Sequence, residues 1–156
     1  MLARLSAIFK KRGGVVQPEQ QHFETIVGSY ILIIELPEQR RIPVGRLGVI
    51  DFLNGFYVYL GSAMNGLESR VRRHLRRAKK LHWHIDYLLS QAHIVEVILL
   101  PGEQRIECAL AQALARTFSP IPHFGSSGCR CKSHLFFNRD RERIKAELVE
   151  AVSRNA

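Results

Sequence analysis

The stretch Tyr57–Leu75, YVYLGSAMNGLESRVRRHL, decides the fold. Tyr57–Leu60 combines aromatic and β-branched residues, which is typical of a β-strand. Gly61 and the small residues after it end that strand, and Gly66 precedes a run with helical spacing of apolar residues. The stretch therefore predicts a strand, a turn and a basic helix.

The predicted helix, residues 67–80, has two unlike faces. At about 100° per residue, its apolar face comprises Leu67, Val71, Leu75 and Ala78. Its opposite face is cationic, and Arg70, His74 and Arg77 lie on the border. A border of two guanidiniums and an imidazole can hold a phosphate, whereas an amphipathic helix with a solvated basic face is the simpler interpretation. The candidate nucleic-acid-binding residues are Arg72, Arg73, Arg76, Arg77, Lys79 and Lys80.

Net charge points to a polyanionic partner. The 156 residues include 23 Lys and Arg against 14 Asp and Glu, a net charge of +9. We expect nucleic acid rather than a membrane, because no apolar run approaches the roughly 18 residues that a membrane span needs. Of the two nucleic acids, we expect DNA. The N-terminal basic residues follow the apolar ones, which is the wrong order for a secretory signal, so a cytoplasmic location is expected.

The order of elements predicts one α+β domain with tails. Expected strands cover residues 29–36, 42–50, 56–60 and 94–100, and expected helices cover 67–80, 81–89, 103–118 and 139–152. The strand 29–36 is a continuous apolar run, which suits a strand buried on both faces. We divide the chain into a flexible basic extension, 1–24, a nuclease-like domain, 25–138, and an accessory helix, 139–156.

Two groups of polar residues require an explanation. Glu107 lies on the apolar side of its predicted helix, where a carboxylate is costly unless it binds a metal or pairs with an arginine. Cys129, Cys131 and His134 offer three zinc ligands within six residues, and a turn stabilised by buried thiols is the alternative. Histidines elsewhere are candidates for a fourth ligand, namely His82, His84, His93 and His123. Trp83 is expected in the core, with stacking on an unpaired base as the alternative.

Several of these residues resemble the signature of a known superfamily. Gly28-Ser29-Tyr30, Tyr59-Leu60-Gly61, Arg70, His74 and Glu107 resemble the GIY-YIG nucleases. The pieces YVYLGSA, GLESRVRRHLRRAKKLHWHIDYLL and CRCKSHLFF resemble more closely its Uri-type branch, also called DUF123, which occurs alone or fused to DNA repair enzymes. The resemblance covers roughly residues 25–138.

The resemblance implies a domain with a small, mixed, mainly antiparallel sheet flanked by helices. It also implies that this domain hydrolyses phosphodiesters with one Mg²⁺ or Mn²⁺. By this resemblance Glu107 is the metal ligand, and Arg70 stabilises charge on phosphorus. Tyr59 is the favoured base and Tyr30 orients the water or the phosphate. His74 either shares the proton transfer or is a hydrogen-bonded histidine at the edge of the core.

The sequence departs from that family at a few positions. Ser29 replaces the middle residue of the first motif but should point to the other face of its strand. The longer spacing between the two tyrosines implies an extended hairpin at residues 37–55. Ser62 and Gly125 stand where many members have a lysine or glutamine and an asparagine, so this chain lacks two polar groups of the family pattern.

Three functions are compatible with this pattern. The first is a metal-dependent DNA endonuclease, acting at a particular structure or lesion. The second is a nucleic-acid-binding module that has the fold without the chemistry. The third is an interaction partner of a repair enzyme that binds it through residues 1–24.

Overall fold

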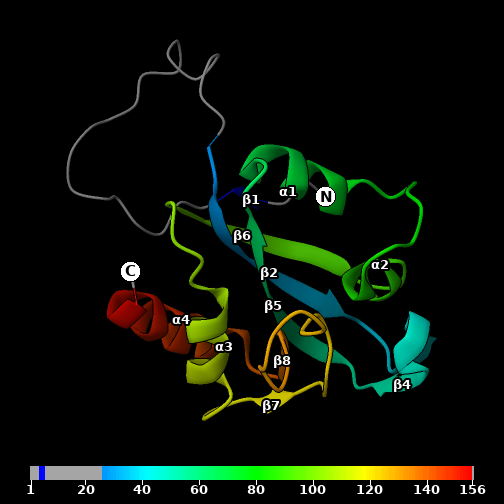
Figure 1. Ribbon diagram of the computed structural model, residues 1–156. Helices are drawn as coiled ribbons and strands as arrows, with labels where there is room; N and C mark the ends of the chain where they lie inside the picture. Colours follow the sequence, from blue (N-terminus) through cyan, green and yellow to red (C-terminus); the bar gives the residue numbers. More distant parts are fainter. Residues whose placement is uncertain (1–3, 6–25, 156) are drawn as a thin grey trace.

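The computed structural model describes residues 4–5 and 26–155. Its main sheet has the strand order β1-β6-β2-β5-β8-β7 (Figure 1). Every neighbouring pair is antiparallel except β1 and β6. The strands are β1 Arg4–Leu5, β2 Gly28–Leu36, β5 Gly55–Ala63, β6 His93–Pro101, β7 Ser119–Pro120 and β8 Leu135–Asn138. The helices are α1 Leu67–Leu75, α2 His84–Leu89, α3 Glu107–Leu114 and α4 Arg141–Asn155. The predicted α+β class is confirmed.

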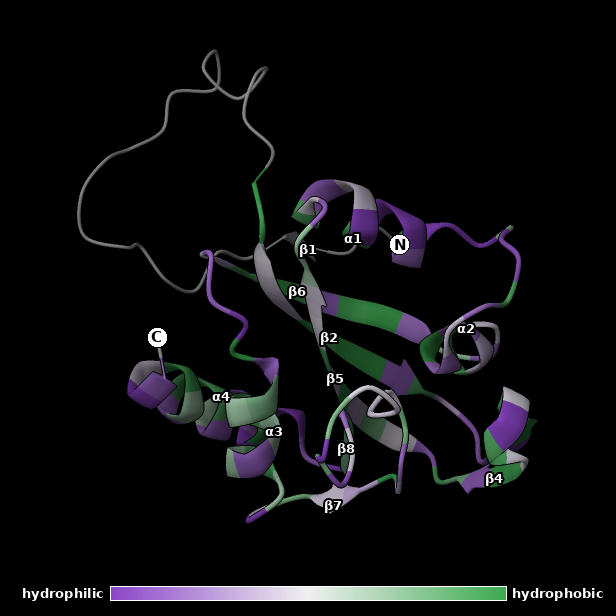
Figure 2. Cartoon of the chain, viewed as in Figure 1, coloured by the Kyte–Doolittle hydropathy of each residue, from purple (hydrophilic) through white to green (hydrophobic). Residues whose placement is uncertain are grey.

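Strand β2 is buried on both faces, as its continuous apolar run predicts. Tyr30, Leu32 and Ile34 face one core cluster, which we call the α1–α2 core. Ile31 and Ile33 alternate with them and face a second cluster, the α3–α4 core. Figure 2 shows hydrophobic residues along this strand and hydrophilic ones on α1. Each fully buried large side chain contributes about 1.5–3 kcal/mol, so both faces stabilise the sheet.

The helices cover the sheet in pairs (Figure 1). Leu67 and Val71 of α1 pack with Ile85 and Leu88 of α2 on one face. On the other face, α3 packs with α4, whose buried residues are Ile144, Leu148, Ala151 and Val152. The C-terminal helix that the sequence presents as an accessory is therefore part of a core.

The predicted strand 42–50 is two strands. β3 Arg40–Pro43 and β4 Val49–Phe52 form a separate two-stranded sheet, with a 3₁₀ turn at Gly45–Leu47 between them. Gly45 and Gly48 have φ values of 47° and 76°, a left-handed conformation that breaks a continuous strand. The extended hairpin expected at residues 37–55 is thus this small sheet.

Helix α1 is shorter than predicted and buries a different face. It ends at Leu75, because Arg76 is extended with ψ 133° and Lys79 Nζ donates hydrogen bonds to the carbonyls of Arg73 and His74. Its buried residues are Leu67, Val71 and His74, the i, i+4 and i+7 positions of one stripe, whereas Leu75 is 42% exposed. The prediction that Leu75 is apolar-facing and His74 is on the border was wrong.

The predicted extension 1–24 lies outside the described residues except for Arg4–Leu5, which pair with Glu96–Val97 of β6. Among the described helices, none has the length and hydropathy needed to cross a membrane.

Candidate active site and metal centre

A pocket of about 250 Å³ opens where β2 begins and β5 ends. Tyr30 from β2, Tyr59 from β5, Arg70 from α1 and Glu107 from α3 all line it. The structure therefore brings together the two phenols, the guanidinium and the carboxylate that the sequence singles out. Other lining residues that matter below are Ser62, Arg105, Cys108, Gly125, Cys129 and His134.

Tyr30 is locked in place by its neighbours. It lies opposite Gly61 in the β2–β5 ladder, and a Cβ at Gly61 would collide with the Tyr30 ring. Only glycine leaves space for the phenol there. The Tyr30 hydroxyl lies 2.7 Å from His74 Nε2, and both side chains are buried. Gly61 of the Tyr59-Leu60-Gly61 motif thus leaves space for the ring of Tyr30, which belongs to the Gly28-Ser29-Tyr30 motif.

Burial keeps this pair uncharged. It raises the pKa of Tyr30 to about 12, against the opposing influence of the Arg70 guanidinium. Burial, followed by the nearby Lys79 ammonium, lowers the pKa of His74 to about 3. His74 is therefore a neutral imidazole at pH 7. Within the described part of the chain, its Nδ1 has no hydrogen-bond partner.

Tyr59 packs beside this pair without a comparable bond. Its ring centroid lies 6.4 Å from that of Tyr30 and 6.1 Å from that of His74. Burial, followed by the neighbouring Tyr30, raises its pKa. Gly125 packs on the Tyr59 ring with a φ of 70°, and a Cβ there would be 3.1 Å from Tyr59 Cε2. The positive φ and this close approach both favour glycine at position 125.

Arg70 is aligned by a chain of contacts that begins at a buried carboxylate. Asp86 is fully buried, and both of its oxygens accept bonds of 2.8 Å from Arg73. It also accepts the backbone N–H groups of His82 and Trp83. The guanidiniums of Arg73 and Arg70 then lie 4.1 and 4.3 Å from the centroid of the Trp83 ring. Trp83 packs against the α1–α2 core, as expected.

Glu107 is the first residue of α3, and Ser29 holds it there. Ser29 Oγ donates to Glu107 Oε2 at 3.4 Å and accepts the N–H of Ile106 at 3.2 Å. Ser29 points away from Tyr30 as predicted, yet its role was missed; a hydroxyl inside a buried apolar run was the available signal. No described arginine forms a salt bridge with Glu107, so of the two alternatives for this carboxylate, the arginine pair is wrong for this part of the chain.

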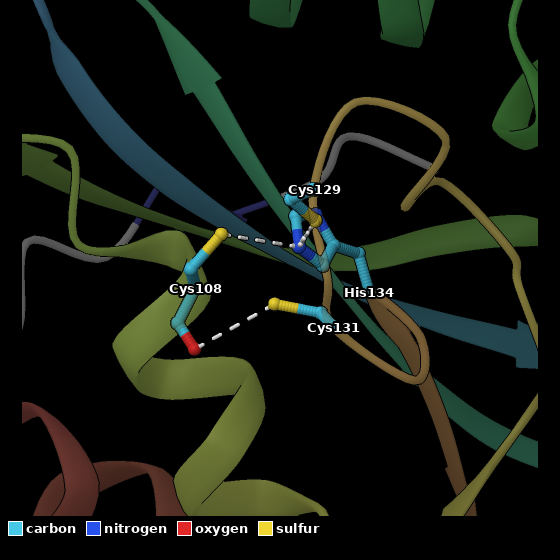
Figure 3. Close-up of side chains that lie close together, drawn as sticks. All are labelled: Cys108, Cys129, Cys131 and His134. Atoms are coloured by element: carbon cyan, nitrogen blue, oxygen red, sulfur yellow. Dashed lines mark hydrogen bonds between the residues drawn. The ribbon is translucent and has the colours of Figure 1, made fainter.

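Next to Glu107, a Cys₃His group lines the same pocket. The ligand atoms of Cys108, Cys129, Cys131 and His134 all lie within 4.8 Å of one another, and the group could bind a metal such as zinc. Cys108 comes from α3 and the other three from the loop before β8 (Figure 3). Burial raises the pKa of the Cys108 thiol to about 12, and the two other thiols add to the effect.

The fourth member of this group is a cysteine, whereas the sequence suggested a histidine. His82, His84 and His123 line a neighbouring hollow of about 670 Å³, which Cys129 also lines. His93 lies near Arg77. Cys108 was missed because it is 21 positions before Cys129, and spacing alone cannot join a helix to a distant loop. An otherwise unexplained third cysteine was the only signal.

The predicted nucleic-acid-binding residues divide into two groups. Arg73 is bound to Asp86, so placing it on a solvated face was wrong, and Lys79 donates hydrogen bonds to the last carbonyls of α1. The remaining four are exposed, namely Arg72, Arg76, Arg77 and Lys80.

The fold and the pocket define a class: an α+β domain in which phenols, a guanidinium and a carboxylate share a pocket with a metal-binding group. A family model described as "Domain of unknown function DUF123" matches residues 29–156, and the chain belongs to this family. The match includes α4. Comparison with curated proteins and with solved structures gave no match.

Proposed function

We propose that this protein is a metal-dependent endonuclease of the GIY-YIG type that hydrolyses phosphodiester bonds in DNA at a particular structure or lesion. One observation carries the proposal: Tyr30, Tyr59, Arg70 and Glu107 come from four elements and line one pocket. A module that only binds the DNA backbone needs Lys and Arg side chains to neutralise phosphates. Two phenols and a carboxylate in the same pocket are groups that hydrolysis uses.

The pocket suits one Mg²⁺ or Mn²⁺. Such hard cations take oxygen ligands and are commonly held by one or two carboxylates together with substrate phosphates and water. Glu107 offers that carboxylate at the wall of an open pocket, steadied by the Ser29 hydroxyl. When bound there, the cation would supply Lewis-acid stabilisation of negative charge on the scissile phosphate.

Two guanidiniums bind and orient the phosphate. Arg70 is held by the carbonyl of Ser62 and by the Trp83 ring, so it stabilises negative charge that develops on phosphorus without first having to be ordered. Arg105, two residues before Glu107, lines the same pocket. It supplies a second positive charge that the sequence interpretation missed.

The geometry favours Tyr30 over Tyr59 as the group that activates water, which reverses the roles assigned from the sequence. The Tyr30 hydroxyl lies 2.7 Å from Nε2 of neutral His74, so Tyr30 can pass its own proton to His74 while its oxygen takes a proton from the attacking water. Burial raises the pKa of Tyr30, and the Arg70 guanidinium partly offsets that rise. Tyr59 has no such acceptor among the described residues, and we assign it to orienting the water or the phosphate.

A cleavage assay with matched variants tests the proposal. Purified protein is incubated with single-stranded, duplex and branched DNA in Mg²⁺ or Mn²⁺. Glu107→Gln should lower the rate at least a hundredfold, because about 3 kcal/mol of transition-state stabilisation is lost. Glu103→Gln, an exposed carboxylate four residues earlier, is the control and should leave the rate unchanged. Cleavage that is unaffected by Glu107→Gln would exclude Glu107 as the metal ligand.

The same assay separates the two phenols. Tyr30→Phe should slow cleavage by about 10²–10⁴-fold, and Tyr59→Phe by less, because only the first change removes the group that accepts the proton. The reverse order would return that role to Tyr59. Binding of every DNA by every variant, with no cleavage in either metal, would instead identify a nucleic-acid-binding module, an alternative that the exposed cations of α1 also favour.

A further inference from the structure

The Cys₃His group has the dimensions of a zinc site. In a tetrahedral site, Zn–S distances of about 2.3 Å and Zn–N distances of about 2.0–2.1 Å place the ligand atoms roughly 3.5–3.8 Å apart. His134 Nε2 lies 3.4 Å from Cys129 Sγ and 3.7 Å from Cys108 Sγ. Figure 3 shows the three sulfur atoms and the imidazole turned toward a common centre.

The orientation of His134 is that of a metal ligand. The imidazole is buried, and its Nε2 faces the sulfur atoms of Cys108 and Cys129. A neutral imidazole coordinates zinc through the lone pair of one ring nitrogen, and here Nε2 is the nitrogen that faces the thiols.

The thiols are poorly accounted for without a metal. Cys129 Sγ reaches the carbonyl of Ser126 at 3.7 Å, and Cys131 Sγ reaches that of Cys108 at 4.0 Å. Both are long contacts of a weak donor, so they contribute little. All three cysteines are free, and pairing any two in a disulfide would leave the third unpaired beside His134. Zn²⁺ binds thiolates and imidazoles well, whereas Mg²⁺ prefers oxygen ligands.

We propose that Cys108, Cys129, Cys131 and His134 bind one Zn²⁺, which fastens the first turn of α3 to the irregular loop that precedes β8. Cys108 directly follows Glu107, and Cys129 and His134 line the same pocket as Glu107. The zinc thereby fixes where the Glu107 carboxylate stands relative to the sheet. Binding of zinc is independent of the proposed nuclease activity; only the importance of the Glu107 position for cleavage rests on that proposal.

The full-length chain is purified without added chelator, and its zinc content is measured by mass spectrometry. About one zinc per chain is expected. Extended X-ray absorption should give three sulfur neighbours near 2.3 Å and one nitrogen near 2.0–2.1 Å. Cys108→Ala should lower the zinc affinity at least tenfold, because it removes the ligand that belongs to α3. His123→Ala, a histidine outside the group, is the control and should keep the zinc.

A second measurement keeps the inference testable if the cysteine variant fails to fold. The unmodified chain, stripped of metal and kept reduced, is titrated with Co²⁺, which reports thiolate coordination through its visible absorption. Saturation at one Co²⁺ per chain, displaced by Zn²⁺ with a rise in melting temperature, supports the site. No zinc in the purified protein and no Co²⁺ absorption would overturn it, as would a folded Cys108→Ala protein with unchanged affinity. A chain that binds zinc but cleaves no DNA would leave this inference intact and remove the nuclease.

Discussion

The two sides of the candidate site are built in different ways. On the side of β2 and α1, hydrogen bonds and ring contacts connect Asp86, Arg73, Trp83, Arg70, Tyr30 and His74. On the side of α3, among the described residues, Glu107 accepts one long hydrogen bond from Ser29, and the adjacent thiols have long contacts with carbonyl oxygens and with His134 Nε2. The first side is organised by protein groups alone, whereas the second would be completed by the proposed zinc.

This difference suggests a division of labour. Groups that must bind phosphate and orient water lie on rigid elements whose side chains support one another. The carboxylate that would hold the catalytic cation is placed on a short helix, and the proposed zinc would position that helix. Damage to either side should therefore leave the other largely intact.

The largest effect is expected from Asp86→Ala. Removing this fully buried carboxylate leaves Arg73 without its partner and two N–H groups at the start of α2 without an acceptor. The free energy of unfolding should fall by about 3–5 kcal/mol, as measured by urea denaturation. Asp51→Ala is the control, because the Arg41–Asp51 pair is exposed and should contribute less than about 1 kcal/mol. Equal losses in both variants would mean that Asp86 does not organise its side of the site.

A smaller, pH-dependent effect is expected from His74. Its pKa in the folded protein, about 3, is below its ordinary value of 6.5. Between these pH values His74 is protonated in the unfolded chain but not in the folded one, so the free energy of unfolding falls as the pH is lowered. The slope is at most about 1.4 kcal/mol per pH unit.

The comparison of the wild type with His74→Gln isolates this contribution. His84 and His134 also have lowered pKa values and add to the slope in both proteins. Unfolding in urea at pH 7, 6, 5 and 4 should therefore give a shallower decline for the variant, even though it is less stable at pH 7. Parallel declines would show that His74 is protonated in the folded protein.

The sequence predicts the sheet side of the site well and the α3 side poorly, for a physical reason. Tyr59 and Arg70 belong to a strand and the helix that follows it, so local spacing nearly fixes their relation, whereas Tyr30, 29 positions before Tyr59, was singled out by the family resemblance. Cys108 and Ser29 act across the edge of the sheet, on partners 21 or more positions away. Such contacts depend on how α3 packs, which periodicity does not reveal.

The errors in α1 have a related origin. The apolar spacing of Leu67 and Val71 is compatible with either Leu75 or His74 as the next buried residue. A histidine that can hydrogen-bond Tyr30 loses little by burial, and tertiary packing selected it over the leucine. Likewise, the helical spacing places Arg73 among surface cations, because it does not reveal the ion pair that Arg73 forms with the buried Asp86.

The smallest effect per residue is expected for DNA binding by exposed cations that belong to neither side of the site. Arg72, Arg76, Arg77 and Lys80 are exposed on and after α1. If they bind phosphates, replacing all four by glutamine should reduce the slope of log Kobs against log salt for duplex DNA. The expected reduction is about 0.9 for each phosphate that the variant no longer neutralises. The Tyr30 and Glu107 sides are untouched, so the fold should be preserved.

A control set with the same charge change makes this result specific. Arg116, Arg139, Arg143 and Arg154 are also exposed, but they lie on or beside α3 and α4. Replacing them by glutamine likewise lowers the net charge from +9 to +5. Fluorescence anisotropy across a range of salt concentrations should show a reduced slope for the α1 set only. A similar reduction in both sets would mean that net charge, rather than the surface at the end of α1, attracts DNA.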